Sequence, residues 1–336
     1  RQMCIRDSVY TGPHEMEMRD VGEPTPSADD EVLIKVAACG ICGSDMHAWH
    51  GHDERRPAPL ILGHEAVGVI VEGSQAGTRV VVNPLVTCQT CEDCRGGREN
   101  LCAQRQIISM PPREGAFAEY LVMPKRNLIP VPADVATSAA ALTEPLGCGW
   151  HAVRLAGQMS AKPLEAARCL VLGGGAIGFG AALALAANKA PEVWIAETNP
   201  QRRALIERAG DFHVFDPLGD GGPAASSVDV VVDGVGFDAT RAKACATVRP
   251  GGVIAHIGLG AGSGGLDVRR MTLQEITFLG TYTYTVRDFQ ETAAAIFDGR
   301  LGPLDWPEIR PLGEGAQAFA DIDAGLVAAP KIILEP

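Results

Sequence analysis

Four cysteines lie close together in the sequence with the spacing of a metal site. They follow the pattern C-x2-C-x2-C-x7-C and comprise Cys88, Cys91, Cys94 and Cys102. Four thiolates at such spacing can close a tetrahedron around Zn²⁺, and a zinc ion with four protein ligands has no free position for a substrate. The sequence therefore predicts a structural zinc site in a lobe at about residues 84–105.

A second group of possible metal ligands is divided among three short motifs. GICGSDMH (40–47) offers Cys42, GHEAVG (63–68) offers His64 and Glu65, and TEPLG (143–147) offers Glu144. Each motif alone is a weak signal, because a His-Glu dipeptide is often part of a polar loop and a single cysteine often packs in a core. Together they form a mixed sulfur, nitrogen and oxygen donor set. Such a set is typical of a zinc site that keeps one position open for an exchangeable ligand.

A glycine-rich turn follows an apolar strand pattern and precedes a helical one. Its sequence is GGGAIG (173–178), and the predicted cofactor contacts are Gly173, Gly175, Ile177 and Gly178. The glycines permit a tight turn and a close approach of the backbone to a pyrophosphate, whose charge is stabilised at the helix N-terminus. This context predicts a dinucleotide-binding site.

The next strand pattern ends at Glu197, which follows Gly178 by 19 residues. A carboxylate at this place binds the ribose 2′-hydroxyl group and disfavours a 2′-phosphate, so the sequence predicts NAD as the cofactor. Two alternative interpretations remain open. Glu197 can simply end a strand, and Arg202 and Arg203 can accept the 2′-phosphate of NADP instead.

The elements that must position these residues change in character along the chain. Between Val9 and Leu142, short strand patterns at 32–38, 66–71, 79–82 and 117–122 alternate with Gly and Pro, which indicates a β-rich unit. Residues 136–153 form a helical pattern that we expect to be interrupted at Pro145. From Arg168 onward strands and helices alternate, which is typical of a parallel, doubly wound sheet.

Length and composition limit the class of protein. The chain has 336 residues, and at roughly 150 residues per domain this corresponds to about two domains. Hydrophobic residues make up 46% and charged residues 21%, which excludes a disordered chain. The net charge of −12 argues against binding to nucleic acid or to an anionic membrane.

The sequence also favours a reducing, cytoplasmic location. It begins without a charged and then apolar signal pattern, and clustered cysteines in a reducing compartment more often bind metal than form disulfides. The uncharged stretch 169–187 just reaches membrane-spanning length, but its three glycines argue against a spanning helix. Residues 1–8 do not match the strand pattern that follows them, so we expect a non-native leader there and assign no role to Cys4.

Taken together, the motifs resemble those of the zinc-dependent medium-chain dehydrogenases, in the branch of sorbitol, L-idonate and threonine dehydrogenases. The resemblance extends from about Val9 to Pro336 and rests on GICGSD, LGHEAVG, the four cysteines, TEPLG, GGGAIG and KIILEP. It implies an α/β protein with a GroES-like, β-rich catalytic domain and a doubly wound Rossmann domain. The catalytic domain would comprise residues 9–143 and 286–336, and the NAD-binding domain residues 144–285.

The resemblance also implies roles for individual residues. Cys42, His64 and Glu144 match ligands of the catalytic zinc, with Glu65 as a ligand that binds and leaves. Asp45 matches the carboxylate that orients the zinc-binding histidine. Ser44 and His47 match a relay that carries the alcohol proton to solvent. The implied cofactors are NAD and two zinc ions per chain, in a homo-oligomer that is a tetramer or a dimer.

The predicted activity is hydride transfer between NAD and a secondary alcohol. The substrate would be a small molecule, a polyol, sugar alcohol or diol similar to sorbitol or L-idonate. Thr283 stands where polyol and idonate dehydrogenases commonly carry an Arg that helps to bind the hydroxyl-rich or carboxylate end of the substrate. Neutral polyols or diols are therefore favoured over sugar acids and sugar phosphates. We expect His50, His52, Arg55 and Arg56 to be solvated loop residues, with substrate contact as the alternative. A zinc-free enoyl or quinone reductase and a catalytically silent NAD-binding zinc protein remain as alternative functions.

Overall fold

The computed structural model describes residues 4–336, which divide into two compact units. Unit 1 runs to Glu144 and adds Thr285–Asp298 and Pro307–Pro336, whereas unit 2 comprises Pro145–Tyr284 and Gly299–Trp306. Unit 1 has a buried apolar core on its main sheet, and unit 2 has its own. Each unit is therefore assembled from segments that are distant in the sequence.

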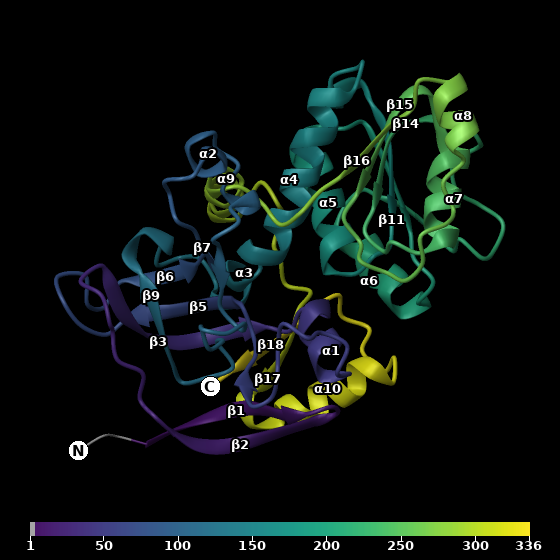
Figure 1. The fold of residues 1–336 in the computed structure, drawn as a ribbon. Coiled ribbons are helices and arrows are strands. Elements are labelled where there is room, and N and C mark those ends of the chain that lie inside the picture. Colours follow the sequence, from purple (N-terminus) through teal and green to yellow (C-terminus); the bar gives the residue numbers. More distant parts are fainter. Residues whose placement is uncertain (1–3) are drawn as a thin grey trace. The chain divides into compact units, whose positions relative to one another are not determined.

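The main sheet of unit 1 has seven strands, in the order β10-β6-β5-β3-β18-β17, with β9 also paired to β3 (Figure 1). The long strand β3 is rich in β-branched and small residues, and most of its residues are buried. The C-terminal strand β18 pairs antiparallel with the end of β3, which joins the two ends of the unit. The strands are β3 (Glu31–Gly40), β5 (Glu65–Ile70), β6 (Arg79–Val82), β9 (Tyr120–Pro124), β10 (Leu128–Pro130), β17 (Glu308–Pro311) and β18 (Ile332–Glu335).

A smaller sheet of unit 1 contains the hairpin of β1 (Cys4–Gly12) and β2 (Glu15–Gly22), with β4 (Leu60–Ile61) paired to β1. The strand begins at Cys4, so the described part of the predicted leader is continuous with it, and residues 1–3 lie outside the described residues. Ile5 is buried, and the buried Asp7 carboxylate accepts a hydrogen bond from the Glu119 backbone N–H at 2.9 Å. The strand therefore begins before Val9, whereas the non-native origin of residues 1–8 stays a prediction.

The helices of unit 1 pack against its strands and against one another, and α3 contacts the central strands β3 and β5. Helix α10 packs against α1 and β2, and α9 packs against α3. The short strands β7 and β8 form a hairpin that closes the loop containing the four cysteines. These elements are α1 (Gly43–Trp49), β7 (Leu85–Val86), α2 (Glu92–Arg95), η1 (Glu99–Leu101), β8 (Gln106–Ile107), η2 (Lys125–Asn127), α3 (Thr137–Ala141), α9 (Val286–Phe297), η4 (Leu312–Glu314) and α10 (Gly315–Asp323).

Unit 2 is built on a six-stranded parallel sheet in the order β13-β12-β11-β14-β15-β16 (Figure 1). Numbered from its first strand, this is the order 3-2-1-4-5-6 of a Rossmann fold, as the strand and helix alternation predicts. The central strands β11 and β14 are almost wholly buried and rich in Val and Leu, as is typical of a parallel sheet covered on both faces. The strands are β11 (Arg168–Leu172), β12 (Glu192–Ala196), β13 (His213–Phe215), β14 (Val228–Asp233), β15 (Val248–His256) and β16 (Thr277–Gly280).

Pro145 does not interrupt the helix in which it lies. The break falls one turn earlier, at Leu142, and the following helix continues through Pro145 to Met159. Proline is tolerated in the first turn of a helix because the N–H that it lacks has no partner there. The helices that lie wholly or mostly in unit 2 are α4 (Thr143–Met159), η3 (Leu164–Ala166), α5 (Ala176–Ala187), α6 (Pro200–Ala209), α7 (Asp238–Thr247) and α8 (Val268–Leu273).

The segment Gly299–Trp306 belongs to unit 2, although the sequence placed it in the catalytic domain. The Trp306 ring packs edge-on against Phe179 of α5, with 5.2 Å between the ring centroids. The Arg300 guanidinium lies over the Trp150 ring. These aromatic contacts account for the difference, because an apolar ring gains most where it is buried.

No helix among residues 4–336 is both long enough and apolar enough to cross a membrane. The uncharged stretch 169–187 forms strand β11, the glycine turn and helix α5 instead.

Candidate active site

The first motif places Cys42 at the start of helix α1, directly after β3. The Asp45 carboxylate accepts a hydrogen bond from the Cys42 backbone N–H at 2.9 Å and another from the Gly63 N–H at 3.2 Å. Asp45 is fully buried, so it ties the cysteine loop to the loop that contains His64. Burial acts to raise the pKa of Asp45, but the neighbouring His64 and Arg56 hold it below its usual value. Asp45 is therefore an ionised anchor between the two motifs.

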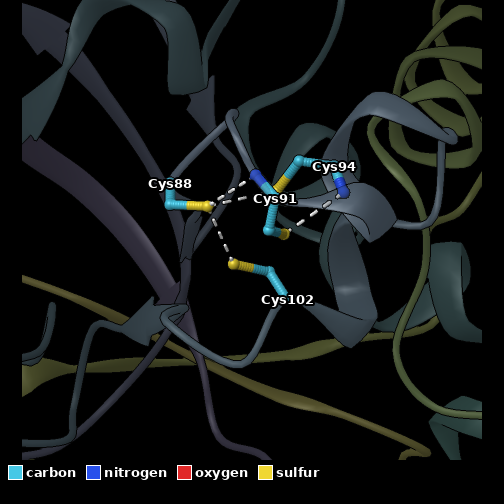
Figure 2. Close-up of side chains that lie close together, drawn as sticks. All are labelled: Cys88, Cys91, Cys94 and Cys102. Atoms are coloured by element: carbon cyan, nitrogen blue, oxygen red, sulfur yellow. Dashed lines mark hydrogen bonds between the residues drawn. The ribbon is translucent and has the colours of Figure 1, made fainter.

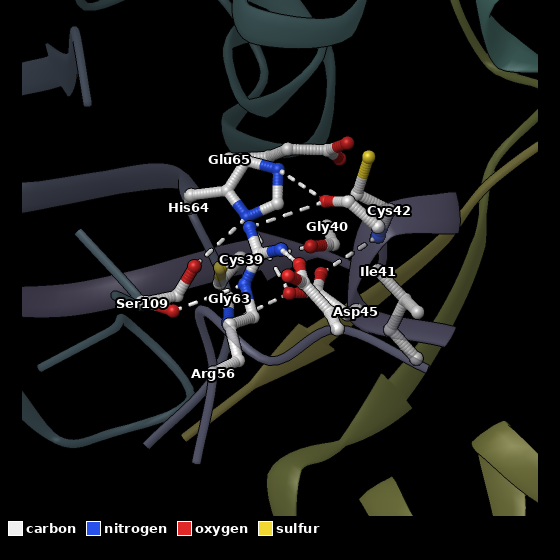
Figure 3. Close-up of polar contacts among 12 residues, drawn as sticks. Cys39, Gly40, Ile41, Cys42, Asp45, Arg56, Gly63, His64, Glu65 and Ser109 are labelled. Atoms are coloured by element: carbon white, nitrogen blue, oxygen red, sulfur yellow. Dashed lines mark hydrogen bonds and ion pairs between the residues drawn. The ribbon is translucent and has the colours of Figure 1, made fainter. Parts of the chain in front are cut away.

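His64 is held by one ring nitrogen and presents the other to the cysteine. Its Nδ1 atom lies 3.4 Å from Asp45 Oδ1 and 3.3 Å from the Ser109 hydroxyl oxygen. Its Nε2 atom lies 3.5 Å from Ser44 Oγ. Figure 3 shows the other ring nitrogen directed toward Ser109. This pattern is the usual one for a metal-binding histidine, in which a carboxylate orients the ring and leaves the far nitrogen free to bind.

Glu65 follows His64 at the start of β5 and is fully buried. Its Oε1 atom lies 2.6 Å from Lys331 Nζ, and the same ammonium donates to the Ile41 carbonyl oxygen at 2.7 Å. Its Oε2 atom is buried without a hydrogen-bond partner. Burial acts to lower the pKa of Lys331, but Glu65, Cys42 and Glu144 outweigh it and raise that pKa, so the ammonium stays charged.

The donor atoms of Cys42, His64 and Glu65 lie within 4.8 Å of one another. A buried carboxylate oxygen without a partner is costly unless something binds it, and the unpartnered Glu65 Oε2 lies in this group. The residues therefore fit a zinc ion. Glu144 is also buried, close enough to Lys331 to act on its charge, but it is not among these three converging donors.

The two predicted relay residues differ in exposure. Ser44 is half-buried, and its hydroxyl lies beside His64 and 3.4 Å from Arg56 Nη2. His47 is exposed on the same helix, three residues further along. The structure thus places the Ser44 hydroxyl beside the donor group and His47 at the surface, and their role as a relay stays a prediction.

Arg56 is buried, which contradicts the expectation that it is a solvated loop residue. Its Nε donates to the Ser109 carbonyl oxygen at 3.0 Å, and its guanidinium pairs with Asp53. Arg55 is exposed and also pairs with Asp53, as expected for a surface charge. The sequence offered no signal for this difference, since the two arginines are adjacent.

The four cysteines of the predicted structural site lie together on the lobe between β7 and β8 (Figure 2). The Cys88 sulfur is 3.8 Å from that of Cys94 and 3.6 Å from that of Cys102. Four sulfurs bound to one zinc at about 2.3 Å would be about 3.8 Å apart, so the cluster fits a zinc ion. The backbone N–H groups of Thr90 and Cys91 lower the pKa of Cys88 to about 6, which favours the thiolate that a metal needs.

The other described cysteines outside these motifs pack in cores, with one exception. Cys39, Cys169 and Cys245 are buried, and burial raises the pKa of Cys169 to about 12. Cys148 is only half-buried. None of these four is among the groups that bring three possible metal ligands together in the described chain.

The glycine motif of unit 2 forms the turn between β11 and α5. Gly173 has a φ of +93°, which favours glycine. A Cβ atom at Gly178 would lie 2.0 Å from the Gly173 carbonyl oxygen, so only glycine lets the helix approach the strand. Gly175 caps α5 with open space around its Cα, and Ile177 lies in the first turn. This geometry fits a pyrophosphate at the helix N-terminus.

Glu197 stands at the end of β12, facing the glycine turn. Its two carboxylate oxygens accept hydrogen bonds from the backbone N–H groups of Gly174 at 2.9 Å and Asn199 at 2.7 Å. The Arg202 guanidinium is 3.8 Å from the same carboxylate. Arg203 donates instead to the Glu197 and Thr198 carbonyl oxygens. Glu197 is therefore a fixed carboxylate beside the turn rather than an exposed strand end.

Comparison with known proteins decides the family. Residues 28–133 match the family model of the alcohol dehydrogenase GroES-like domain, and residues 176–298 match that of the zinc-binding dehydrogenases. L-galactonate-5-dehydrogenase of Escherichia coli (strain K12) is 32% identical over 302 residues, covering 86% of each chain. This chain belongs to the zinc-dependent medium-chain alcohol dehydrogenases.

Other members of this family are similar over nearly the whole chain. "Probable D-xylulose reductase A" of Neosartorya fischeri is 30% identical over 346 residues, covering 94% of this chain and 93% of the relative. A zinc-binding dehydrogenase of Sinorhizobium meliloti 1021, solved with NADP bound, superposes with a TM-score of 0.89 at 27% identity and 100% coverage of both chains. The predicted GroES-like and Rossmann domains and the class of zinc-binding, NAD(P)-dependent oxidoreductase are thus confirmed.

Proposed function

We propose that this medium-chain dehydrogenase interconverts a secondary alcohol of a polyol, sugar alcohol or diol, of the sorbitol or L-idonate kind, with the corresponding ketone. The observation that carries the proposal is that the donor atoms of Cys42, His64 and Glu65 lie close together and that the buried Glu65 Oε2 atom has no hydrogen-bond partner. The names of the relatives support the substrate class, since the two most similar ones described above are an L-galactonate dehydrogenase and a D-xylulose reductase.

The proposed metal ligands are Cys42, His64 and Glu144, with Glu65 as an exchangeable ligand. Zinc held there would act as a Lewis acid that lowers the pKa of the substrate hydroxyl, and NAD would accept the hydride. Asp45 and Ser109 fix the His64 ring through Nδ1. Lys331 holds Glu65 by one oxygen and leaves the other free to bind or release.

The proton of the alcohol must leave a buried site. Ser44 Oγ lies beside His64, so a substrate hydroxyl bound in this group would be within reach of it. The serine hydroxyl accepts the proton and passes on its own, and the His47 imidazole releases it to water. Imidazole suits the outer position because its pKa is near neutrality. Arg56 holds the Ser44 side chain from the other side.

Replacement of Ser44 tests this assignment. Ser44→Ala should reduce kcat roughly 100-fold or more in NADH absorbance assays with sorbitol, xylitol, L-idonate and L-galactonate, while zinc content stays constant. Ser74→Ala, in the exposed turn between β5 and β6, is the matched control. Unchanged turnover in Ser44→Ala would remove the relay, and no activity of the wild type with any polyol would remove the proposed substrate class.

The proposed cofactor is NAD rather than NADP. The support is the fixed Glu197 carboxylate, which can bind two ribose hydroxyls and would repel a 2′-phosphate. Glu197→Ala should lower the ratio of kcat/KM for NAD over NADP at least about tenfold. Glu207→Ala, exposed on α6, should leave that ratio unchanged. A wild type that prefers NADP would identify Arg202 as the residue that decides the choice.

We also propose two zinc ions per chain and a cytoplasmic homo-oligomer, a tetramer or a dimer. The two donor groups support the stoichiometry. The division of the chain into two units supports a catalytic domain in which the NAD-binding domain is inserted. Metal analysis of the purified protein and light scattering measure these properties directly; a single zinc or a monomer would contradict them.

A further inference from the structure

Two histidines and an aspartate converge on the surface of unit 1, outside the site described above. His14 lies in the turn between β1 and β2, His50 follows α1, and Asp323 is the last residue of α10. One possible donor atom from each lies within 4.8 Å of those of the other two. We propose that His14, His50 and Asp323 form a third metal site, which binds a divalent transition-metal ion of the Zn²⁺ or Ni²⁺ type.

The donor chemistry selects this class of ion. Two imidazoles and one carboxylate suit Zn²⁺, Ni²⁺ or Cu²⁺, whereas Mg²⁺ and Ca²⁺ require oxygen ligands. His50 Nε2 lies 2.8 Å from Asp323 Oδ1, and ligands bound to one zinc at about 2.0–2.2 Å would be about 3.4 Å apart. A bound ion would therefore take the place of the hydrogen between His50 and Asp323, and these two side chains would move apart only slightly.

The backbone at His14 is an independent observation. Gly12 pairs with Glu15, so Pro13 and His14 form a two-residue turn, and His14 has a φ of +62°. Among residues other than glycine, histidine is one of the types enriched at such a φ. The turn can therefore present an imidazole at this place.

The His14 ring is also held in place. Its backbone N–H donates to the Trp49 carbonyl oxygen at 2.7 Å, and its ring packs edge-on to the Trp49 ring at 4.3 Å between centroids. The His50 ring lies 5.3 Å from that of His14 and 5.2 Å from that of Trp49. Both imidazoles thus pack against the Trp49 ring, which restricts their movement and reduces the entropic cost of binding.

The electrostatic setting favours a cation. His50 caps the C-terminal end of α1, and Asp323 ends α10, so two helix ends with negative partial charge meet here. The side chains are open to solvent, with 26% of His50 and 45% of Asp323 exposed, so an ion can enter and leave. His52, with its ring 5.6 Å from that of His50, is the nearest further imidazole. A bound ion would connect the hairpin, α1 and α10.

Titration of tag-free protein that carries its own zinc with Ni²⁺ tests the proposal. Ni²⁺ at this site quenches the fluorescence of Trp49, and calorimetry measures the stoichiometry. We expect one Ni²⁺ per chain, bound without release of zinc. His14→Gly should weaken binding at least about tenfold while folding is retained, because glycine suits the φ of this turn. His50→Gln should weaken it similarly.

His213→Gln is the matched control, because that exposed histidine also stacks on a tryptophan, Trp194, at 4.7 Å. No group of three possible ligands among residues 4–336 includes His213. The His213→Gln variant should bind Ni²⁺ as the wild type does. The proposal would be overturned if the wild type showed no saturable binding, if Ni²⁺ released zinc, or if His14→Gly and His50→Gln bound as tightly as the wild type.

Discussion

The two clusters that fit zinc are held by the chain in different ways. Cys88, Cys91, Cys94 and Cys102 come from one loop closed by the β7–β8 hairpin, and their support is mainly local backbone N–H groups. The mixed cluster of Cys42, His64 and Glu65 depends on β3, β5 and the residue before β18, which are far apart in the sequence. We refer to the first as the cysteine cluster and the second as the mixed cluster.

Because of this difference, we expect the cysteine cluster to contribute to stability and the mixed cluster to contribute to the reaction. Four thiolates fill every position of a tetrahedral ion, so the cysteine cluster can only hold its lobe together. The mixed cluster has fewer donors and one carboxylate oxygen without a partner, so it can exchange a ligand. Its geometry must therefore be maintained by the surrounding residues, namely Asp45, Ser109 and Lys331.

The largest expected effect is on turnover, from removal of a donor of the mixed cluster. His64→Gln should lower kcat by more than about 1000-fold, because the Lewis acid contributes several kcal/mol to the reaction. The melting temperature should change by only a few degrees. NADH production and differential scanning calorimetry measure the two. His213→Gln is the control, and full activity of His64→Gln would contradict the assignment.

The second effect is on stability, from loss of a thiol of the cysteine cluster. Cys94→Ser should remove one zinc per chain and reduce the free energy of unfolding by about 3–5 kcal/mol, since metal binding contributes to folding. Metal analysis and urea unfolding would detect this change. Cys245→Ala, which removes a buried thiol in unit 2, should leave the metal content constant. A stable Cys94→Ser protein with both metals would overturn the comparison.

The third effect concerns the buried ion pair beside the mixed cluster. Lys331→Met leaves Glu65 without its cation, and removal of one partner of a buried pair costs about 3–5 kcal/mol. We expect a smaller loss, about 2–3 kcal/mol, because Zn²⁺ would neutralise part of the carboxylate charge. Turnover should fall as well. The exposed Lys125→Met is the control, and unchanged unfolding and kinetics of Lys331→Met would show that the pair has no such role.

The smallest expected effect is on zinc affinity, from removal of one hydroxyl group beside each cluster. Ser109 Oγ lies 3.3 Å from His64 Nδ1, and Thr90 Oγ1 donates to the Cys88 sulfur at 3.6 Å. Ser109→Ala should reduce the affinity of the mixed cluster for zinc about 10-fold, as replacement of residues behind a metal ligand does. Thr90→Val, on an exposed loop, should have less effect. Competition with a chelator measures both affinities, and a larger effect of Thr90→Val would reverse the comparison.

Short-range patterns predicted much of this molecule. The doubly wound sheet follows from the alternation of strands and helices, and helix α5 occupies the residues expected for it. The convergence of the four cysteines follows from their spacing. The metal and relay roles of individual residues stay predictions, although the structure brings Cys42, His64 and Glu65 together.

Contacts between distant segments could not be predicted in this way. Lys331 reaches the Ile41 carbonyl across 290 residues of sequence, and only the pairing of β18 with β3 brings them together. A lysine directly before an apolar strand is only a weak signal that this lysine is buried and pairs with a buried carboxylate. Arg56 is buried and Arg55 exposed because the loop turns between them, which no periodic pattern indicates. His14 likewise meets His50 only through the docking of the hairpin.

The pairing of β18 with β3 has a consequence for synthesis on the ribosome. Once Cys102 has emerged from the exit tunnel, the cysteine cluster has all of its ligands and can take up its metal. The nascent chain already carries Cys42, His64 and Glu65 at that stage, but their cation Lys331 is translated only after the whole of unit 2. The mixed cluster can therefore reach its final arrangement only after the cysteine cluster has all of its ligands.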